Sequence, residues 1–188
     1  MTTDEVAVPP AMPPGRVRVF LALLPTPAVV AALAAHGALW QWGERAVRYA
    51  PPDWHLTLHF LGAVAHDRLP ALLAALPVND VAPFELTLGQ AEVWPQGIAV
   101  LCPLTLPAGL QRLHERLAVV LRQQGWPLDL RPFRPHVTLA RQAPHAVPPA
   151  RCPAWAWPVS SYALVASTGE PGSRYRVLQS LPFGQVGP

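Results

Sequence analysis

The sequence contains one short polar pattern twice. The string HLTLHFLG occupies residues 55–62 and HVTLAR occupies residues 136–141, so that His-x-Thr-Leu occurs at two well-separated places. Because the chain has seven histidines in all, chance is a poor explanation for two copies of the same pattern. Imidazole and hydroxyl groups serve acid–base catalysis and anion binding, and each is present here in duplicate.

Each copy reads as a β-strand, in which alternate side chains face opposite sides. In the first copy we expect His55, Thr57 and His59 on one face. The apolar residues between them, together with Phe60, are expected on the face that packs into the core. The second copy should present its histidine and threonine in the same way. A lone strand histidine more often serves a structural hydrogen bond, but two matching His-Thr pairs favour a ligand site.

These residue types fit an in-line displacement at phosphorus. One imidazole would remove a proton from the attacking oxygen and the other would protonate the departing oxygen, while Thr57 and Thr138 hydrogen-bond the nonbridging oxygens. Histidine suits both roles because its unperturbed pKa is about 6.5. Neither copy has a third histidine or a carboxylate at metal-ligand spacing. We therefore expect neither a metal nor another cofactor beside His55 and His136.

The two copies belong to two larger units of the same design. A strand, a proline that opens a helix, a loop and the His-x-Thr-Leu strand occur once in residues 17–61 and again in residues 97–141. The interval from the helix-opening proline to the histidine is nearly equal in the two units, starting from Pro27 in the first and Pro107 in the second. Two similar units commonly pack about an approximate two-fold axis. The two strands are therefore expected side by side or facing each other, with both histidines at one groove.

Hydrophobic periodicity predicts the remaining elements. Helices are expected where leucine and alanine recur on one helical face, and strands where Val, Leu, Phe and Tyr are dense. Thr26 fits the N-cap of the first helix, with Pro27 in its first turn. The expected helices cover residues 28–37, 68–76 and 107–125, and the expected strands cover residues 16–24, 55–61, 84–93, 97–104, 135–141, 160–168 and 174–183.

Length and composition indicate one compact globular domain, or two small lobes that share one core. At 188 residues and 51% hydrophobic, the chain can bury a substantial core. The proline-rich residues 1–15 are expected to form a flexible tail, and residues 16–188 a single domain of two lobes. No apolar run approaches the roughly 20 residues that span a bilayer, and the start of the chain has no signal-peptide pattern. We expect a monomeric, cytoplasmic protein without a membrane partner.

The charged residues and the cysteines say little about the function of the protein. The chain has a formal net charge of +3, and all of its basic residues are arginines, whose planar fork of donors matches phosphate oxygens. A compositional drift towards arginine explains this bias equally well, so the basicity permits a nucleic-acid partner without arguing for one. Cys102 and Cys152 lack metal-ligand spacing and are expected to be reduced thiols, with a disulfide or a reactive role as the alternatives.

The paired patterns are the signature of the two-histidine (2H) phosphoesterases. HLTLHFLG together with RPFRPHVTLAR resembles in particular the RNA 2',3'-cyclic phosphodiesterases, also called 2'-5' RNA ligases. The segments RVFLALLP, PPDWHLTLHFLG, FRPHVTLAR and ALVASTGEPGSRYRVLQSLPF stand in the order that this family has. The resemblance covers most of the chain and leaves out about the first fifteen residues.

The resemblance implies a bilobal, duplicated α+β fold in which two antiparallel sheets flank a central groove, with helices outside. It makes His55 the proton donor to the leaving 3'-oxygen and His136 the base that acts on water. Thr57 and Thr138 would hold the phosphate. The substrates would be RNA ends or nucleotides that bear a 2',3'-cyclic phosphate, and the product would be a 2'-phosphate.

Three further residues are candidates for substrate binding. Arg141 matches a family position at which an arginine faces the phosphate, but strict alternation points it away from His136, so that a bulge or strand end is needed to turn it. Arg134 is a candidate contact to the RNA backbone, with a solvated loop charge as the alternative. His59 stands where the family often has a basic residue that steers substrate. The histidines outside the two patterns are expected at the surface, and the tryptophans beside strands and helix ends in the core.

Two other functions remain open at this point. The nearer one is a different reaction in the same groove, such as cleavage of 2'-5' linkages or RNA ligation. The more distant one is a nucleotide-binding module without catalysis, although two complete His-x-Thr sets argue against it. The preferred nucleobase is not predictable from the sequence.

Overall fold

We analysed a computed structural model of the chain, which describes residues 15–76, 80–129, 131–170 and 173–184. The expected tail, residues 1–15, lies outside the described residues except for Gly15. The helices are α1 (Pro27–Gly37), α2 (Leu69–Ala75) and α3 (Ala108–Gln123). The strands are β1 (Arg16–Leu23), β2 (Val47–Arg48), β3 (Leu56–Ala65), β4 (Phe84–Trp94), β5 (Ile98–Pro103), β6 (Val137–Arg141), β7 (Trp155–Val159), β8 (Ser161–Glu170) and β9 (Ser173–Pro182).

The predicted helices and strands all form at the expected places. Thr26 caps α1 by accepting a hydrogen bond from the backbone N–H of Val29, and Pro27 opens the helix. The leucine face of α3 is buried as predicted. The sequence analysis missed β7, because the proline within Trp155–Val159 argues against a strand. β7 lies at the edge of the sheet, where a missing backbone N–H leaves no ladder bond unmade.

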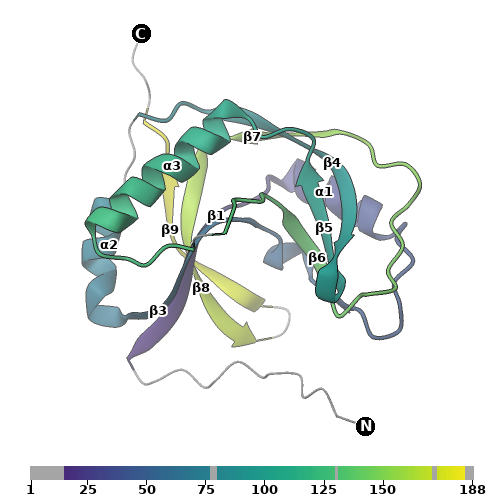
Figure 1. The fold of residues 1–188 in the computed structure, drawn as a ribbon, viewed down its shortest axis with the longest axis horizontal. Helices are drawn as coiled ribbons and strands as arrows, with labels where there is room; N and C mark the ends of the chain where they lie inside the picture. Colours follow the sequence, from purple (N-terminus) through teal and green to yellow (C-terminus); the bar gives the residue numbers. More distant parts are fainter. Residues whose placement is uncertain (1–14, 77–79, 130, 171–172, 185–188) are drawn as a thin grey trace.

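The strands form one antiparallel sheet in the order β7-β4-β5-β6-β3-β1-β8-β9, with β2 paired to β6. The first lobe is β3-β1-β8-β9 and the second is β6-β5-β4-β7. In each lobe the strand with the His-x-Thr-Leu pattern pairs with a strand that precedes it across a helix, β3 with β1 and β6 with β5. The two lobes meet where Leu56 of β3 pairs with Val137 of β6. The expectation of two separate sheets is therefore wrong in that detail. Figure 1 shows the sheet splayed into two groups of strands about this junction.

The main core lies between the sheet and the helices. It contains the buried leucines of α1 and α3 together with Val19, Leu21 and Leu23 of β1. The alternate residues of β1, Phe20 and Ala22, instead form a small second cluster with Ala163 and Val165 on the opposite side of the sheet. We call this opposite side, on which the helices do not pack, the inner face.

The helices connect the two lobes. α1 follows β1 of the first lobe and contacts β7 of the second, whereas α3 follows β5 of the second lobe and contacts both β3 of the first lobe and β4 of the second. Among the described residues, none of the helices is long and apolar enough to cross a membrane.

Candidate active site

The two His-x-Thr-Leu strands meet at the centre of the sheet. Leu56 and Val137, each directly after a histidine, are fully buried in the main core. Because side chains alternate along a strand, His55 and His136 project from the other side, onto the inner face. The antiparallel pairing runs each histidine towards the threonine of the opposite strand, so that His55 approaches Thr138 and His136 approaches the threonine of β3.

Ring contacts confirm that the histidines lie on the inner face. The His55 imidazole lies 4.8 Å from the ring of Phe20 and 4.7 Å from that of Tyr175, measured between ring centroids. The His136 imidazole lies 4.4 Å from the ring of Trp94 in the other lobe. Each histidine is therefore packed against an aromatic wall of its own lobe, and the sequence analysis did not foresee these partners.

The same hydrogen bond orients both imidazoles. Nδ1 of His55 donates to the carbonyl oxygen of Asp53 at 2.8 Å, and Nδ1 of His136 donates to the carbonyl oxygen of Arg134 at 2.7 Å. A carbonyl can only accept, so Nδ1 must carry the proton in each ring. Nε2 is then the atom that faces a ligand, as an acceptor when the ring is neutral and as a donor when it is protonated.

Burial lowers the pKa of both histidines. For His55 the lowering by burial is opposed by the Asp53 hydrogen bond and is reinforced by the positive charges of His136 and Arg141. For His136 the lowering by burial is opposed by the Arg134 hydrogen bond and reinforced by Arg141 and Arg134. In the empty site both rings therefore favour the neutral form near pH 7, and a negatively charged ligand would shift them back towards protonation.

A buried ion pair anchors the turn that precedes His55. The carboxylate of Asp53 is almost fully buried and accepts a hydrogen bond from the backbone N–H of Arg174 at 3.0 Å. The guanidinium of Arg174 approaches the same carboxylate at 3.7 Å. Because these contacts join residues far apart in the sequence, they fix the position of the carbonyl that orients the His55 ring.

A β-bulge turns Arg141 onto the inner face. Thr138 pairs with Val100 and Ala140 with Ala99, so Leu139 has no partner on β5. Because of this extra residue, the side chains that follow it lie on the opposite face of the sheet from the one that strict alternation predicts. The bulge that the sequence analysis required for Arg141 is therefore present, and Nε of Arg141 donates to the hydroxyl of Tyr49 at 3.0 Å.

Tyr49 is a site residue that the sequence analysis missed. Its backbone N–H donates to the carbonyl oxygen of Leu139, which continues the β2–β6 pairing. Its hydroxyl accepts a hydrogen bond from Arg141 of the second lobe, and burial together with the nearby Tyr49 raises the pKa of Tyr175 in the first lobe. The only signal in the sequence is an aromatic residue shortly before the first His-x-Thr pattern, and strand pairing across the chain was needed to interpret it.

A matching bulge corrects the predicted faces of His59 and Phe60. On β3, Thr57 pairs with Ala22 and His59 pairs with Leu21, so Leu58 has no partner on β1. His59 therefore faces the main core with Leu21, not the inner face with His55. Phe60 is 54% exposed and faces the inner side, whereas strict alternation had placed it in the core.

His59 stacks within a row of three rings. Its ring centroid lies 4.1 Å from that of His114 on α3, and the His114 ring lies 3.9 Å from that of Phe133. Nε2 of His59 hydrogen-bonds the carbonyl oxygen of His114 at 2.9 Å. The expectation of a surface position is wrong for His114, which is half-buried here, and for His36, which is buried against Trp155. His66 and His145 are exposed as expected.

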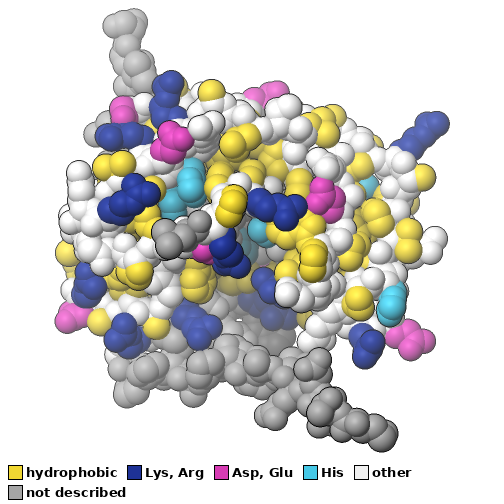
Figure 2. Space-filling view, viewed as in Figure 1, with side chains coloured by type: hydrophobic (Ala, Val, Ile, Leu, Met, Phe, Trp, Pro, Cys, Tyr) yellow, Lys and Arg dark blue, Asp and Glu magenta, His cyan; other side chains and the backbone are white. Residues whose placement is uncertain are grey.

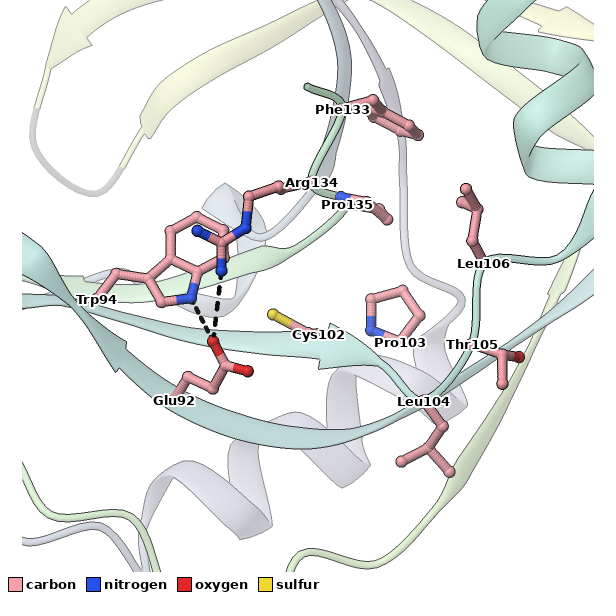
Figure 3. Close-up of a pocket in the computed structure, with 10 residues that line it drawn as sticks. All are labelled: Glu92, Trp94, Cys102, Pro103, Leu104, Thr105, Leu106, Phe133, Arg134 and Pro135. Carbon is pink, nitrogen blue, oxygen red and sulfur yellow. Dashed lines mark hydrogen bonds and ion pairs between the residues drawn. The ribbon is translucent and has the colours of Figure 1, made fainter. Parts of the chain in front are cut away.

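Two cavities lie near the histidines. One has a volume of about 270 Å³ and is lined by Trp94, whose ring contacts that of His136, with further apolar walls from Leu104, Leu106 and Phe133. Figure 3 shows the guanidinium of Arg134 over the Trp94 indole in this cavity, at 4.2 Å from the ring centroid, with both residues directed towards Glu92. Trp94 is therefore a cavity wall, although the sequence analysis expected it in the core.

The second cavity has a volume of about 160 Å³ and is lined by His55, Tyr175, Val177 and residues 51–54. Figure 2 shows histidine and arginine side chains gathered around the hollow in the middle of the molecule. Among the described residues, no group of three or more His, Cys, Asp and Glu side chains is arranged to hold a metal ion. The inner face carries the imidazoles of His55 and His136, with Thr57 and Thr138 on the same two strands and Arg141 beyond the bulge.

The chain is similar in sequence to known proteins. The sequence model of the family described as the 2'-5' RNA ligase superfamily matches residues 27–169. The chain is 36% identical over 145 residues to the RNA 2',3'-cyclic phosphodiesterase of Thermus thermophilus, covering 69% of this chain and 71% of that protein. It is 34% identical over 134 residues to the protein of the same name from Escherichia coli, covering 69% and 76%.

A solved structure shares the fold over nearly its whole length. The crystal structure of E. coli LigT complexed with 3'-AMP is 29% identical in sequence and superimposes with a TM-score of 0.79. The match covers 90% of this chain and 99% of that one.

Proposed function

The chain belongs to the 2'-5' RNA ligase superfamily, and on this premise we propose that it is an RNA 2',3'-cyclic phosphodiesterase. It opens a terminal 2',3'-cyclic phosphate to a 2'-phosphate without a metal or another cofactor. The observation that supports the proposal most directly is the pair of histidines on the inner face. In both of them Nδ1 donates a hydrogen bond to a backbone carbonyl oxygen. Similar proteins from E. coli and T. thermophilus with this activity in their names support the choice of substrate.

The reaction is an in-line attack of water on the cyclic phosphorus. His136 is neutral and takes a proton from the water through Nε2, while a new bond forms between the water oxygen and phosphorus. The bond from phosphorus to the 3'-oxygen breaks, and His55 in its protonated form donates the Nε2 proton to that oxygen. The ribose regains its 3'-hydroxyl, and the phosphate remains on the 2'-oxygen. Each proton transfer typically contributes about 10²- to 10⁴-fold in rate.

The phosphate is held by groups that donate hydrogen bonds to its nonbridging oxygens. Thr57 and Thr138 supply one hydroxyl from each lobe, and the pairing of Leu56 with Val137 supports their approach to the same anion. Arg141 supplies positive charge, because the bulge at Leu139 turns it towards the histidines and its charge already lowers their pKa. Donors fixed in this way stabilise the charge that develops in the transition state without further rearrangement.

The substrate phosphate also explains how a histidine with a lowered pKa can serve as an acid. The empty site disfavours the imidazolium, mainly through burial. A bound phosphate anion brings negative charge next to the ring and raises its pKa, since an opposite charge favours the protonated form. Proton uptake by His55 is therefore coupled to substrate binding.

The decisive experiment is a hydrolysis assay with 2',3'-cyclic AMP, in which phosphorus NMR identifies the product. We expect 2'-AMP, formed at an unchanged rate in excess EDTA. Formation of 3'-AMP would reverse the assignment of the leaving oxygen. Turnover restricted to 2'-5' linked oligonucleotides, or joining of RNA ends in place of hydrolysis, would show a different reaction in the same site. Binding without turnover would show a nucleotide-binding module.

A further inference from the structure

The two histidines of the site have the same backbone partner but opposite side-chain charges beside it. Each Nδ1 donates to the carbonyl oxygen of the residue two positions earlier, which is Asp53 for His55 and Arg134 for His136. The carbonyl contacts are alike, yet one of these residues carries a carboxylate and the other a guanidinium. The proposed hydrolysis gives the two rings opposite roles, and the two charges are divided in the same way.

The carboxylate of Asp53 is built into the interior of the protein. The residue is 2% exposed, and its Oδ1 accepts the backbone N–H of Arg174. Its other oxygen, Oδ2, is buried without a hydrogen-bond partner among the described residues, and the guanidinium of Arg174 lies 3.7 Å from it. A buried carboxylate oxygen without a hydrogen bond is costly to a fold, so its presence calls for an explanation.

The charge of this carboxylate acts on the His55 imidazole. Burial lowers the pKa of His55, whereas the hydrogen bond to the Asp53 carbonyl and the charge of the Asp53 carboxylate raise it. His136 and Arg141 are cationic neighbours and lower the pKa of His55. The Tyr175 ring packs against the imidazole and is neutral, because burial raises the pKa of its hydroxyl. Asp53 therefore supplies the negative charge that favours the protonated form of His55.

The equivalent side chain at the second histidine is a cation. Burial lowers the pKa of His136, and the charges of Arg141 and Arg134 lower it further, against the hydrogen bond to the Arg134 carbonyl. The Trp94 ring lies between these groups, 4.2 Å from the guanidinium of Arg134 and 4.4 Å from the His136 imidazole (Figure 3). Arg134 therefore favours the neutral form of His136.

Each of the two charges is only partly offset by a partner of opposite sign. The guanidinium of Arg174 lies 3.7 Å from the Asp53 carboxylate, and the carboxylate of Glu92 lies 3.8 Å from the Arg134 guanidinium. Both distances are long compared with the 2.7–2.9 Å of a charge-assisted hydrogen bond. The first histidine thus keeps a negative neighbour, and the second keeps a positive one.

We propose that Asp53 and Arg134 are positioning residues that divide the roles of acid and base between two chemically identical imidazoles. Asp53 favours the imidazolium of His55, which makes this ring the proton donor to the leaving oxygen. Arg134 favours neutral His136, which makes that ring the acceptor of the proton from water. Surroundings that treat two titratable groups differently are what assign such roles. The proposal rests on the proposed function, and in this role neither side chain needs to touch the substrate.

Substitutions at Asp53 and Arg174 distinguish this role from a purely structural one. Asp53→Asn removes the negative charge but keeps an oxygen that can accept the backbone N–H of Arg174. Arg174→Gln removes the opposing positive charge and keeps that N–H. NMR titration of the imidazole protons in the free enzyme should show a lower pKa of His55 in Asp53→Asn and a higher one in Arg174→Gln. Asp80→Asn, at an exposed carboxylate paired with Arg116, should change neither the spectrum nor the pKa of His55.

The same variants should alter the pH dependence of turnover. Above the pH optimum, hydrolysis of 2',3'-cyclic AMP depends on the fraction of His55 that is protonated. Asp53→Asn should therefore lose roughly threefold or more of its rate on the alkaline side, because the opposite charge is gone. Well below the optimum the ring is protonated in both enzymes, so the rate there should be unchanged. Arg174→Gln should not show this alkaline loss.

The signs are reversed at the second histidine. Arg134→Gln should raise the pKa of His136, because it removes a positive charge and leaves the backbone carbonyl in place. Glu92→Gln should lower the pKa of His136, because the charge of Arg134 is then unopposed. Arg151→Gln, at an exposed arginine of the segment between β6 and β7, serves as the matched control and should have no effect.

An unchanged or higher pKa of His55 in Asp53→Asn would overturn the proposal, as would changes of the same sign in Asp53→Asn and Arg174→Gln. An equal loss of turnover at every pH would show that Asp53 acts only through the fold. If Asp53→Asn does not fold, the sign of the effect of Arg174→Gln on His55 decides. If no cyclic phosphate is hydrolysed but the pKa values change as expected, the proposed function fails while the role of the two charges stands.

Discussion

Leu56 and Val137 pair across the boundary between the two lobes, and each directly follows one of the two inner-face histidines. The pair lies at the centre of the strand order, where β3 and β6 run antiparallel, so His55 and His136 lie on either side of it. Both side chains of this pair are fully buried in the core. The pair therefore holds the two strands in place and fixes the distance between the two histidines. An acid and a base of the same residue type can then act on opposite sides of one phosphate.

Replacing either histidine should remove most of the activity. His55→Ala and His136→Ala should each reduce kcat by at least about 10². The double variant should lose much less than the product of the two losses, because the residues act as a unit. Steady-state kinetics with 2',3'-cyclic AMP measures all three. Near-normal turnover in either single variant would remove that residue from the mechanism.

The pKa of both histidines should rise when an anion binds. Burial lowers each pKa in the empty site, and a bound sulfate favours the imidazolium. Because binding then takes up protons, sulfate affinity should increase as the pH falls from 7.5 towards 5.5. NMR titration of the imidazole protons, with and without sulfate, gives the shifts directly. Unchanged pKa values would show that the anion does not bind between the rings.

The same coupling should make the rate depend on pH in a bell shape. The acidic limb should report the histidine that must be neutral, and the alkaline limb the histidine that must be protonated. Both limbs should shift when the substrate saturates the enzyme, because the substrate phosphate raises the pKa of both rings. A rate independent of pH between 5 and 8 is incompatible with this pairing of roles.

Replacing Arg141 and replacing Arg134 by alanine should affect substrate binding differently. Arg141→Ala should weaken binding of a mononucleotide cyclic phosphate and of an RNA end alike, by about tenfold or more, because both present the same phosphate. Arg134 is stacked on Trp94 at the edge of the cavity beside His136. Arg134→Ala should raise the Michaelis constant only for longer RNA. Equal effects of the two substitutions on both substrates would refute the distinction.

Tyr49→Phe should reproduce part of the Arg141 defect. The substitution removes only the hydroxyl that accepts from Nε of Arg141, and a hydrogen bond to a charged group contributes about 1.5–3 kcal/mol. The Michaelis constant should rise by less than it does in Arg141→Ala, with the shape of the pH profile unchanged. In an Arg141→Ala background, the same substitution should have no further effect. A full additional loss in that background would assign Tyr49 a role independent of Arg141.

The stacked histidines should make the fold sensitive to acid. Burial, followed by the charge of His59, lowers the pKa of His114 to about 4, whereas an unfolded chain has a histidine pKa of about 6.5. The unfolded chain therefore binds more protons between these values, and the free energy of unfolding decreases as the pH falls from 6.5 towards 4. This contribution is complete above pH 6.5.

His114→Phe keeps a flat ring between His59 and Phe133 but cannot be protonated. The difference in Tm between pH 7.5 and pH 5 should be smaller for this variant than for the wild-type protein. His66→Gln, at an exposed histidine, serves as the matched control and should leave the difference unchanged. An unaltered difference in His114→Phe would place the acid sensitivity elsewhere.

The sequence alone determined the pair of histidines, the threonines beside them and nearly all of the helices and strands. These features are local, because a repeated four-residue pattern and the periods of strand and helix are visible within a single segment. The near-equal spacing of the two units also indicated that the two His-x-Thr-Leu strands lie side by side, as β3 and β6 do at the centre of the sheet.

Only the tertiary structure decided which side chains the strands present to the site. A bulge depends on the register with a distant partner strand, and one extra residue exchanges the faces of all that follow. For this reason Arg141 and Phe60 lie on the inner face, whereas His59 packs against α3. The sequence analysis did not predict the role of Tyr49 or the Asp53–Arg174 ion pair for the same reason. The residues in contact lie far apart in the sequence and come together only in the folded protein.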